Sequence, residues 1–131
     1  MRKLIIERTL NSPGVIFDPD RNFFEISGES RPPEVAAFYS EILDWFDDYS
    51  SNVARSGKRT EPVVFNLDFE YFNSSSEKYL LDFCKKINSA SAGGMNLSVR
   101  WLYEKNDIDM LEAGKRISKI VKYPFEYLEK Q

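Results

Sequence analysis

Histidine is absent from this sequence of 131 residues, and cysteine occurs once, as Cys84. Histidine is the usual general base near neutral pH, the commonest zinc ligand and the base in Ser–His and Cys–His nucleophile pairs. The sequence also lacks a Walker loop and a G-x-G-x-x-G motif. Catalysis would have to rest on carboxylates, Lys, Tyr or Ser alone. We therefore expect a protein that is not an enzyme and that holds no cofactor or metal.

Long apolar runs are also missing, because charged residues interrupt the early segment KLIIERTL. Signal peptides and membrane spans need longer runs. A lone cysteine cannot form an intrachain disulfide. Cys84 falls at an apolar position of a helical pattern, which predicts a core residue in a reducing compartment. We expect a soluble, cytoplasmic protein that does not interact with a membrane.

Clustered basic charge is a third absence, since the net charge is −3 and both signs are interspersed. The basic pairs Lys85–Lys86 and Lys115–Arg116 both have acidic residues close by in the sequence. Nucleic-acid binding needs clustered Lys and Arg to contact phosphates. We therefore expect no nucleic-acid partner.

Three segments alternate between apolar and polar residues, which is typical of β-strands. They are NFFEIS, VVFNLDFEY and NLSVRWLY. In the second, the pattern places Phe65, Leu67, Phe69 and Tyr71 on one face. One-sided alternation predicts a sheet with one face packed and the other largely open. KLIIER and GVIFDP are expected to add strands, with DPDRN turning the second of them into FFEIS as a hairpin.

Three segments with helical spacing lie between or after these strands: PPEVAAFYSEILDWFDDY, SEKYLLDFCKKINSASAGG and NDIDMLEAGKRISKIV. Asn106 or Asp107 is suited to cap the third. Right-handed crossovers between successive parallel strands place all three helices on one face of the sheet. We predict one α/β domain over residues 1–131, with a mixed sheet of about five strands. YPFEYL is a short end segment.

The run NSSSE joins the second alternating strand to a helix. Ser74 and Glu77 match a capping box, in which the serine hydroxyl and the glutamate carboxylate each bind an amide at the helix start. A hydroxyl at such a junction is also exposed and rigidly placed, and a phosphate there would gain free amide donors. The residues alone leave both interpretations open.

Four segments resemble those of the SiaC-like regulatory phosphoproteins, small bacterial proteins whose fold is similar to STAS domains and anti-sigma-factor antagonists. SPGVIFD resembles the family's N-terminal strand. ISGESRPPEVAAFYSEILDWFDDY resembles its Gly-Glu-Ser-x-Pro-Glu segment and long first helix. LDFEYFNSSSEKYLLDF resembles its Tyr-x-Asn-[Thr/Ser]-Ser-Ser run, and LSVRWLYEKND its Trp-x-Tyr strand. The resemblance covers nearly the whole chain and implies a single STAS-like domain.

The resemblance implies a partner-switching cycle. In the family the hydroxyl after the Asn is phosphorylated, which falls here on Ser74, with Ser75 as the main alternative. A dedicated kinase adds the phosphate and a PP2C-type phosphatase removes it. The unphosphorylated form binds and activates a diguanylate cyclase, which raises cyclic-di-GMP and favours biofilm formation or aggregation.

The partner or kinase footprint is expected to combine the loop after FFEIS with the residues around the serine run. Arg31 is also a candidate partner for a phosphate on Ser74. The expected footprint residues are Glu29, Ser30, Arg31, Glu34, Tyr71, Phe72, Asn73, Ser75 and Ser76.

Two other hypotheses belong to different classes of protein. Asp68 and Glu70 share one strand face, a spacing compatible with a small carboxylate-dependent hydrolase. Alternatively, the chain is a purely structural interaction subunit in which Ser74 only caps a helix.

Overall fold

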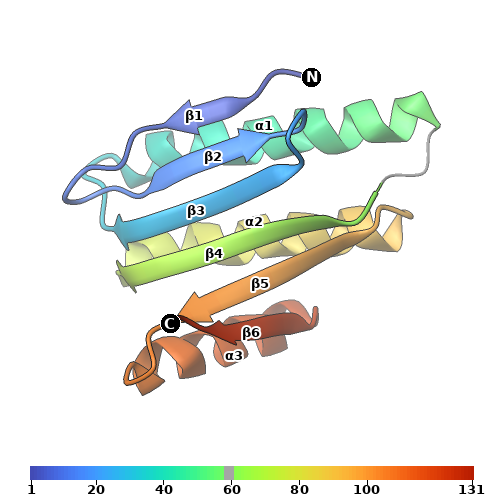
Figure 1. Cartoon of the computed structure of the whole chain (residues 1–131). Helices are drawn as coiled ribbons and strands as arrows, with labels where there is room; N and C mark the ends of the chain where they lie inside the picture. Colours follow the sequence, from blue (N-terminus) through green and yellow to red (C-terminus); the bar gives the residue numbers. More distant parts are fainter. Residues whose placement is uncertain (58–60) are drawn as a thin grey trace.

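The computed structural model describes residues 1–57 and 61–131, which form a sheet covered by helices on one face (Figure 1). The described residues contain six strands and three helices. The strands are β1 (Leu4–Ile6), β2 (Gly14–Asp18), β3 (Phe23–Ser30), β4 (Val63–Phe72), β5 (Leu97–Tyr103) and β6 (Phe125–Glu129). The helices are α1 (Val35–Ser56), α2 (Ser74–Ala92) and α3 (Ile108–Val121).

The strands lie in sequence order across the sheet, β1-β2-β3-β4-β5-β6. β1, β2 and β3 pair antiparallel, and β3 to β6 pair parallel. One helix makes each parallel crossover, and all three helices lie behind the sheet in Figure 1. The predicted α/β class, mixed sheet and one-sided helix layer are confirmed.

The sheet has six strands where about five were predicted, because YPFEYL contains an edge strand. In β6, Phe125 is buried and Tyr127 half-buried, while Glu126 and Leu128 are exposed. β6 pairs parallel with β5, beginning at Val99. This pairing stabilises the short segment as an edge strand of the sheet.

Aromatic side chains fill the space between the sheet and the helices. Phe17 of β2 contacts Trp45 of α1, Phe65 of β4 and Phe83 of α2, with ring centroids 5.0, 5.4 and 6.0 Å apart. Each buried ring contributes roughly 1.5–3 kcal/mol, so these contacts fix the helix layer on the sheet. Cys84 lies in this core as predicted, and burial raises the pKa of its thiol to about 12.

A β-bulge in β4 changes which side chains face outward near its end. Gly28 pairs with Phe69, but the next residue, Glu29, pairs with Tyr71, so Glu70 has no direct partner. A bulge shifts the later residues to the opposite face. Tyr71 is therefore 48% exposed on the open face, whereas Phe72 packs inward on Phe69. The prediction that Tyr71 shares a face with Phe69 was wrong.

None of the three helices in the described ranges is both long and apolar enough to cross a membrane.

Candidate functional site

The loop after β3 and the serine run lie at the same end of the sheet, where β3 and β4 finish side by side. Ser30 pairs with Phe72, and the Asn73 amide donates to the Ser30 carbonyl at 3.1 Å. Because parallel strands end at one edge, their following loops meet there. This confirms that the two predicted segments are adjacent.

Asn73, and not Ser74, caps α2. The Asn73 side-chain oxygen accepts a hydrogen bond from the Ser76 amide at 2.9 Å. Ser74 is the first residue of the helix. Glu77 does not return to the helix start, because its carboxylate binds Arg116 of α3. The predicted capping box of Ser74 and Glu77 was therefore wrong. Asparagine is as good a cap as serine, and capping one residue earlier places the Ser76 side chain in the interior.

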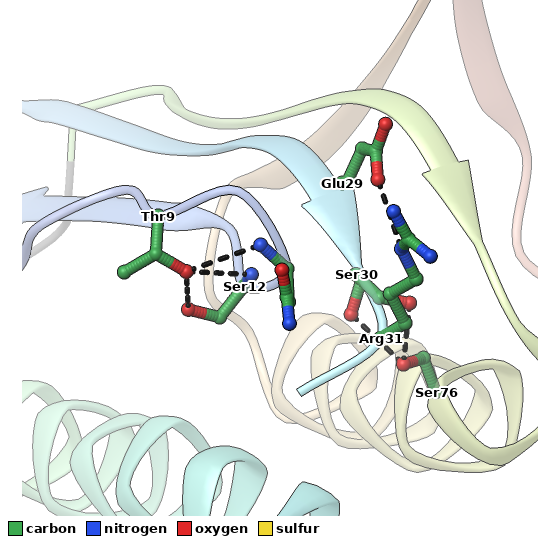
Figure 2. A network of polar contacts seen from close by, with 7 residues as sticks. Thr9, Ser12, Glu29, Ser30, Arg31 and Ser76 are labelled. Carbon is green, nitrogen blue, oxygen red and sulfur yellow. Dashed lines mark hydrogen bonds and ion pairs between the residues drawn. The ribbon is translucent and has the colours of Figure 1, made fainter. Parts of the chain in front are cut away.

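A buried hydrogen-bond network, which we call the buried junction, consists of Ser30, Tyr39 and Ser76. The Ser76 hydroxyl donates to the Ser30 carbonyl at 2.9 Å and accepts from the Ser30 hydroxyl at 2.9 Å. The Ser30 hydroxyl also contacts the Tyr39 hydroxyl. All three residues are fully buried, and Figure 2 shows Ser30 facing Ser76 across the strand end. The buried junction ties β3, α1 and the first turn of α2 together.

Burial raises the pKa of Tyr39 to about 12, against the smaller lowering effect of its hydrogen bonds to Ser30 and Ser76. Tyr39 also stacks on Tyr79 of α2, with ring centroids 5.6 Å apart. Every polar group of the buried junction has a partner, so it stiffens the helix start instead of leaving a costly unpaired hydroxyl.

The exposed rim is the surface around this junction, consisting of the exposed Arg31, Tyr71, Ser74 and Ser75 and the partly exposed Glu29. Arg31 binds Glu29 at 3.0 Å, and Figure 2 shows their side chains pointing toward each other above the strand end. The Arg31 amide donates to the Asn11 carbonyl at 2.8 Å, which brings the β1–β2 loop beside the rim. Arginine and tyrosine are enriched among the residues that dominate the binding energy of protein interfaces, so this surface suits protein binding.

The remaining predicted footprint residues fall into two groups. Glu34 is exposed at the start of α1, and Phe72 and Asn73 are partly exposed. Ser30 and Ser76 are fully buried, so in this conformation they offer no surface to a partner. Their hydroxyls instead hold the segments that carry the exposed rim.

A second arginine, Arg8, approaches the rim from the β1–β2 loop, and the sequence pattern did not reveal it. Arg8 binds Glu70 on β4. Its side chain crosses Gly28, where an added Cβ would lie 2.7 Å from the Arg8 Nε. Gly28 also has a φ of +110°, which L side chains rarely adopt. A glycine is therefore required for the guanidinium to reach Glu70.

Asp68 and Glu70 do not form a joint carboxylate site. Asp68 binds Lys130 at 2.8 Å, whereas Glu70 binds Arg8. Burial lowers the pKa of Lys130, but hydrogen bonds and charges of Asp68 and Glu104 together raise it above its ordinary value. Each carboxylate is neutralised by its own cation, so the arrangement does not favour activation of a shared water.

The site is thus a rigid strand–helix junction of an α/β domain that presents exposed serine hydroxyls, an arrangement compatible with a regulatory protein. The comparison with protein families agrees. The sequence model of the SiaC family regulatory phosphoproteins matches residues 6–130, and the chain belongs to this family.

Solved and curated relatives extend over almost the whole chain. Apo-SiaC from Pseudomonas aeruginosa is 23% identical, with a TM-score of 0.84 over 98% of this chain and 99% of the other. A chain in the crystal structure of the diguanylate cyclase SiaD in complex with its activator SiaC, also from P. aeruginosa, is 22% identical, with a TM-score of 0.84 over 97% and 99%. An uncharacterised protein of P. aeruginosa strain UCBPP-PA14 is 25% identical over 95% of this chain and 94% of its own length.

Proposed function

We propose that this protein is a phosphorylation-controlled activator in a bacterial partner-switching pathway. Its unphosphorylated form binds and activates a diguanylate cyclase, and phosphorylation of Ser74 releases that partner. The observation that carries the proposal is the exposed Ser74 hydroxyl, held at the first position of α2 by the buried junction, in a member of a family of regulatory phosphoproteins.

Membership of the SiaC family supports a regulatory phosphate, and the complex of P. aeruginosa SiaC with SiaD supports a cyclase as the class of effector. The exposed rim supplies the surface for this contact, with Tyr71 as its aromatic anchor and the Glu29–Arg31 pair beside it. Ser75 belongs to the same surface, and Glu34, Phe72 and Asn73 extend it. A cytoplasmic location follows from this role, because the cyclase substrate GTP and the kinase substrate ATP are cytoplasmic.

The switch requires two enzymes. A dedicated kinase transfers the γ-phosphoryl group of ATP to Ser74 Oγ, forming the O–P bond, releasing ADP and freeing the hydroxyl proton. A PP2C-type phosphatase hydrolyses that bond with water and returns the serine and inorganic phosphate. The phosphate adds about −1.5 to −2 charge to a surface on which Glu77 lies three residues away, so it changes the rim without entering the core.

The proposal is tested by measuring the conversion of GTP to cyclic-di-GMP by a diguanylate cyclase of the source organism. The cyclase is assayed alone, with the wild-type protein, and with Ser74→Ala, Ser74→Glu and Ser75→Glu variants. We expect the wild-type and Ser74→Ala proteins to stimulate the cyclase, and Ser74→Glu to lose at least tenfold in affinity.

Ser75→Glu is the matched control, with the same charge placed one residue further along the helix, and we expect it to retain more activity than Ser74→Glu. Equal stimulation by the wild-type protein and Ser74→Glu would contradict the switch at Ser74. Failure of every variant to bind any cyclase, with the fold intact, would leave only the structural-subunit hypothesis.

A further inference from the structure

The charged residue nearest in sequence to Ser74 is Glu77, and its partner is Arg116 of α3. The Arg116 Nη2 donates to Glu77 Oε1 at 2.6 Å, and the Arg116 Nε donates to Glu77 Oε2 at 3.3 Å. The guanidinium therefore binds the carboxylate with two parallel hydrogen bonds. The Arg116 side chain is 50% exposed and that of Glu77 is 24% exposed, so solvent and other groups can reach the pair.

Close packing of α3 on the sheet fixes the position of this arginine. Gly114 is buried against Trp101 of β5, where an added Cβ would lie 2.6 Å from the indole ring. The Trp101 indole N–H donates to the Met110 carbonyl of α3 at 2.9 Å. Arg116 follows Gly114 by two residues, so its backbone is held on a rigid element beside α2.

Helical phase separates Ser74 from Ser75. Residues three apart on a helix are neighbours, with Cβ atoms about 5–6 Å apart, so Ser74 is adjacent to Glu77, whose carboxylate binds α3. Ser75 lies four residues before Tyr79, which stacks on Tyr39 of α1. Ser75 is therefore turned about 100° around the helix from Ser74, toward the side that carries Tyr79.

We propose that Arg116 reads the phosphorylation state of Ser74 by exchanging ion-pair partners. In the unphosphorylated protein it binds Glu77; a phosphate on Ser74 repels the Glu77 carboxylate and takes over the guanidinium. This inference rests on the proposed function for the modification itself, and it identifies the group that receives the phosphate. It is an alternative to the sequence-based hypothesis that Arg31, which binds Glu29 at 3.0 Å, receives the phosphate, and the experiment below distinguishes the two arginines.

The exchange is favourable for three reasons. A phosphate carries more charge than a carboxylate and matches the guanidinium fork equally well. A half-exposed ion pair contributes little stability, so breaking the bond to Glu77 costs little. Because Arg116 is already held near the first turn of α2, little side-chain freedom remains to be lost. A phosphate on Ser75 lies on the side of α2 that carries Tyr79, so it lacks the proximity to Arg116.

The experiment uses the full chain with phosphoserine incorporated at position 74 during translation, so that neither the kinase nor the effector is needed. The second pKa of the phosphate is measured by ³¹P NMR titration in four backgrounds: unchanged, Arg116→Gln, Arg31→Gln and Arg100→Gln. Arg100 is the matched control, because it forms a similar exposed pair with Glu126 at 2.6 Å on the open sheet face. Circular dichroism checks that each variant is folded.

We expect Arg116→Gln to raise the second pKa of the phosphate by about 0.5 pH unit or more, because the dianion loses its cation. Arg31→Gln and Arg100→Gln should titrate like the parent. The inference is overturned if Arg116→Gln has no effect, or if Arg31→Gln gives the larger shift. It is also overturned if phosphoserine at position 75 responds to Arg116→Gln as strongly as phosphoserine at position 74.

Failure of this inference and failure of the proposed function are separate results. If phosphoserine at position 74 leaves cyclase affinity unchanged, the proposed switch fails whatever the titration shows. If cyclase affinity falls but Arg116→Gln leaves the titration unchanged, the switch stands and another group receives the phosphate.

Discussion

The buried junction and the exposed rim share two short segments, the end of β3 and the start of α2, yet their chemistry is opposite. Ser74 and Ser76 are two residues apart on one helical turn. Ser76 is fully buried and hydrogen-bonded to Ser30, whereas Ser74 is exposed. The difference arises from helical phase, which Asn73 sets by capping the helix one residue before Ser74. Neighbouring hydroxyls of the same type can therefore have a purely structural and a regulatory role.

The difference between Ser74 and Ser76 also explains how the first turn of a helix could accept a regulatory phosphate. The hydroxyl that would be phosphorylated is not the one that stabilises the helix, because Asn73 provides the cap and Ser76 provides the anchor. We therefore expect modification of Ser74 to leave the fold intact and to change only the surface. In the proposed function, stability and regulation depend on different side chains of one turn.

The largest expected difference in stability is between a glutamate introduced at the buried Ser76 and one introduced at the exposed Ser74. Ser76→Glu would bury a carboxylate beside Ser30 and Tyr39 without a cation, so we expect it to lower the free energy of unfolding by roughly 3 kcal/mol or more. Ser74→Glu at the exposed helix start should remain within about 0.5 kcal/mol of the parent. Urea denaturation followed by circular dichroism measures both values. Similar losses for the two variants would mean that Ser74 and Ser76 do not differ in environment.

Alkaline pH is expected to weaken the buried junction. Burial raises the pKa of Tyr39 to about 12, whereas a tyrosine in the unfolded chain titrates near 10. Tyr39 therefore ionises at a lower pH in the unfolded chain than in the folded protein. The stability contributed by the protonated Tyr39 is complete below pH 10 and is lost as pH rises toward 12. A shift of this size corresponds to a loss on the order of 1–3 kcal/mol.

The pH dependence of urea unfolding between about pH 9 and 11.5 tests this expectation when the parent is compared with Tyr39→Phe. The variant should lose stability less steeply, although Cys84, whose pKa burial also raises to about 12, still contributes to its decline. Identical slopes for the two proteins would show that Tyr39 is not shielded from solvent.

The smallest effect concerns the helix cap. Asn73→Ala removes the acceptor for the Ser76 amide and should cost about 1 kcal/mol. Ser74→Ala replaces the first helical residue with a better helix former and should cost nothing measurable. Thermal unfolding of the two variants distinguishes the caps. A loss confined to Ser74→Ala would restore the capping box that the sequence pattern indicated.

The general architecture could be predicted because it follows from patterns that recur along the chain. Alternation around Phe65 and Leu67 marks a strand with one buried face, and the order of strands and helices restricts the crossovers to one side of the sheet. The adjacency of Glu29 and the serine run follows from parallel pairing of β3 and β4. Asp107, one of two residues suited to cap α3, does so by accepting from the Met110 amide at 3.0 Å.

The details of the site depend on contacts that local patterns do not contain. Tyr71 faces outward because a single bulge at Glu70 shifts the register, and nothing in VVFNLDFEY marks that position. The choice of Asn73 as cap depends on the partner that Ser76 finds 46 residues away in Ser30. The bond between Glu77 and Arg116 likewise joins residues separated by 39 positions.

The most direct test of the central claim is to locate the phosphate on the protein isolated from its native cells. Tandem mass spectrometry of the peptide that spans Phe72 to Lys78, before and after treatment with a PP2C-type phosphatase, resolves the three serines. We expect a phosphate on Ser74 that the phosphatase removes, and none on the buried Ser76. A phosphate found on Ser75 or Ser76 while Ser74 remains unmodified would contradict it.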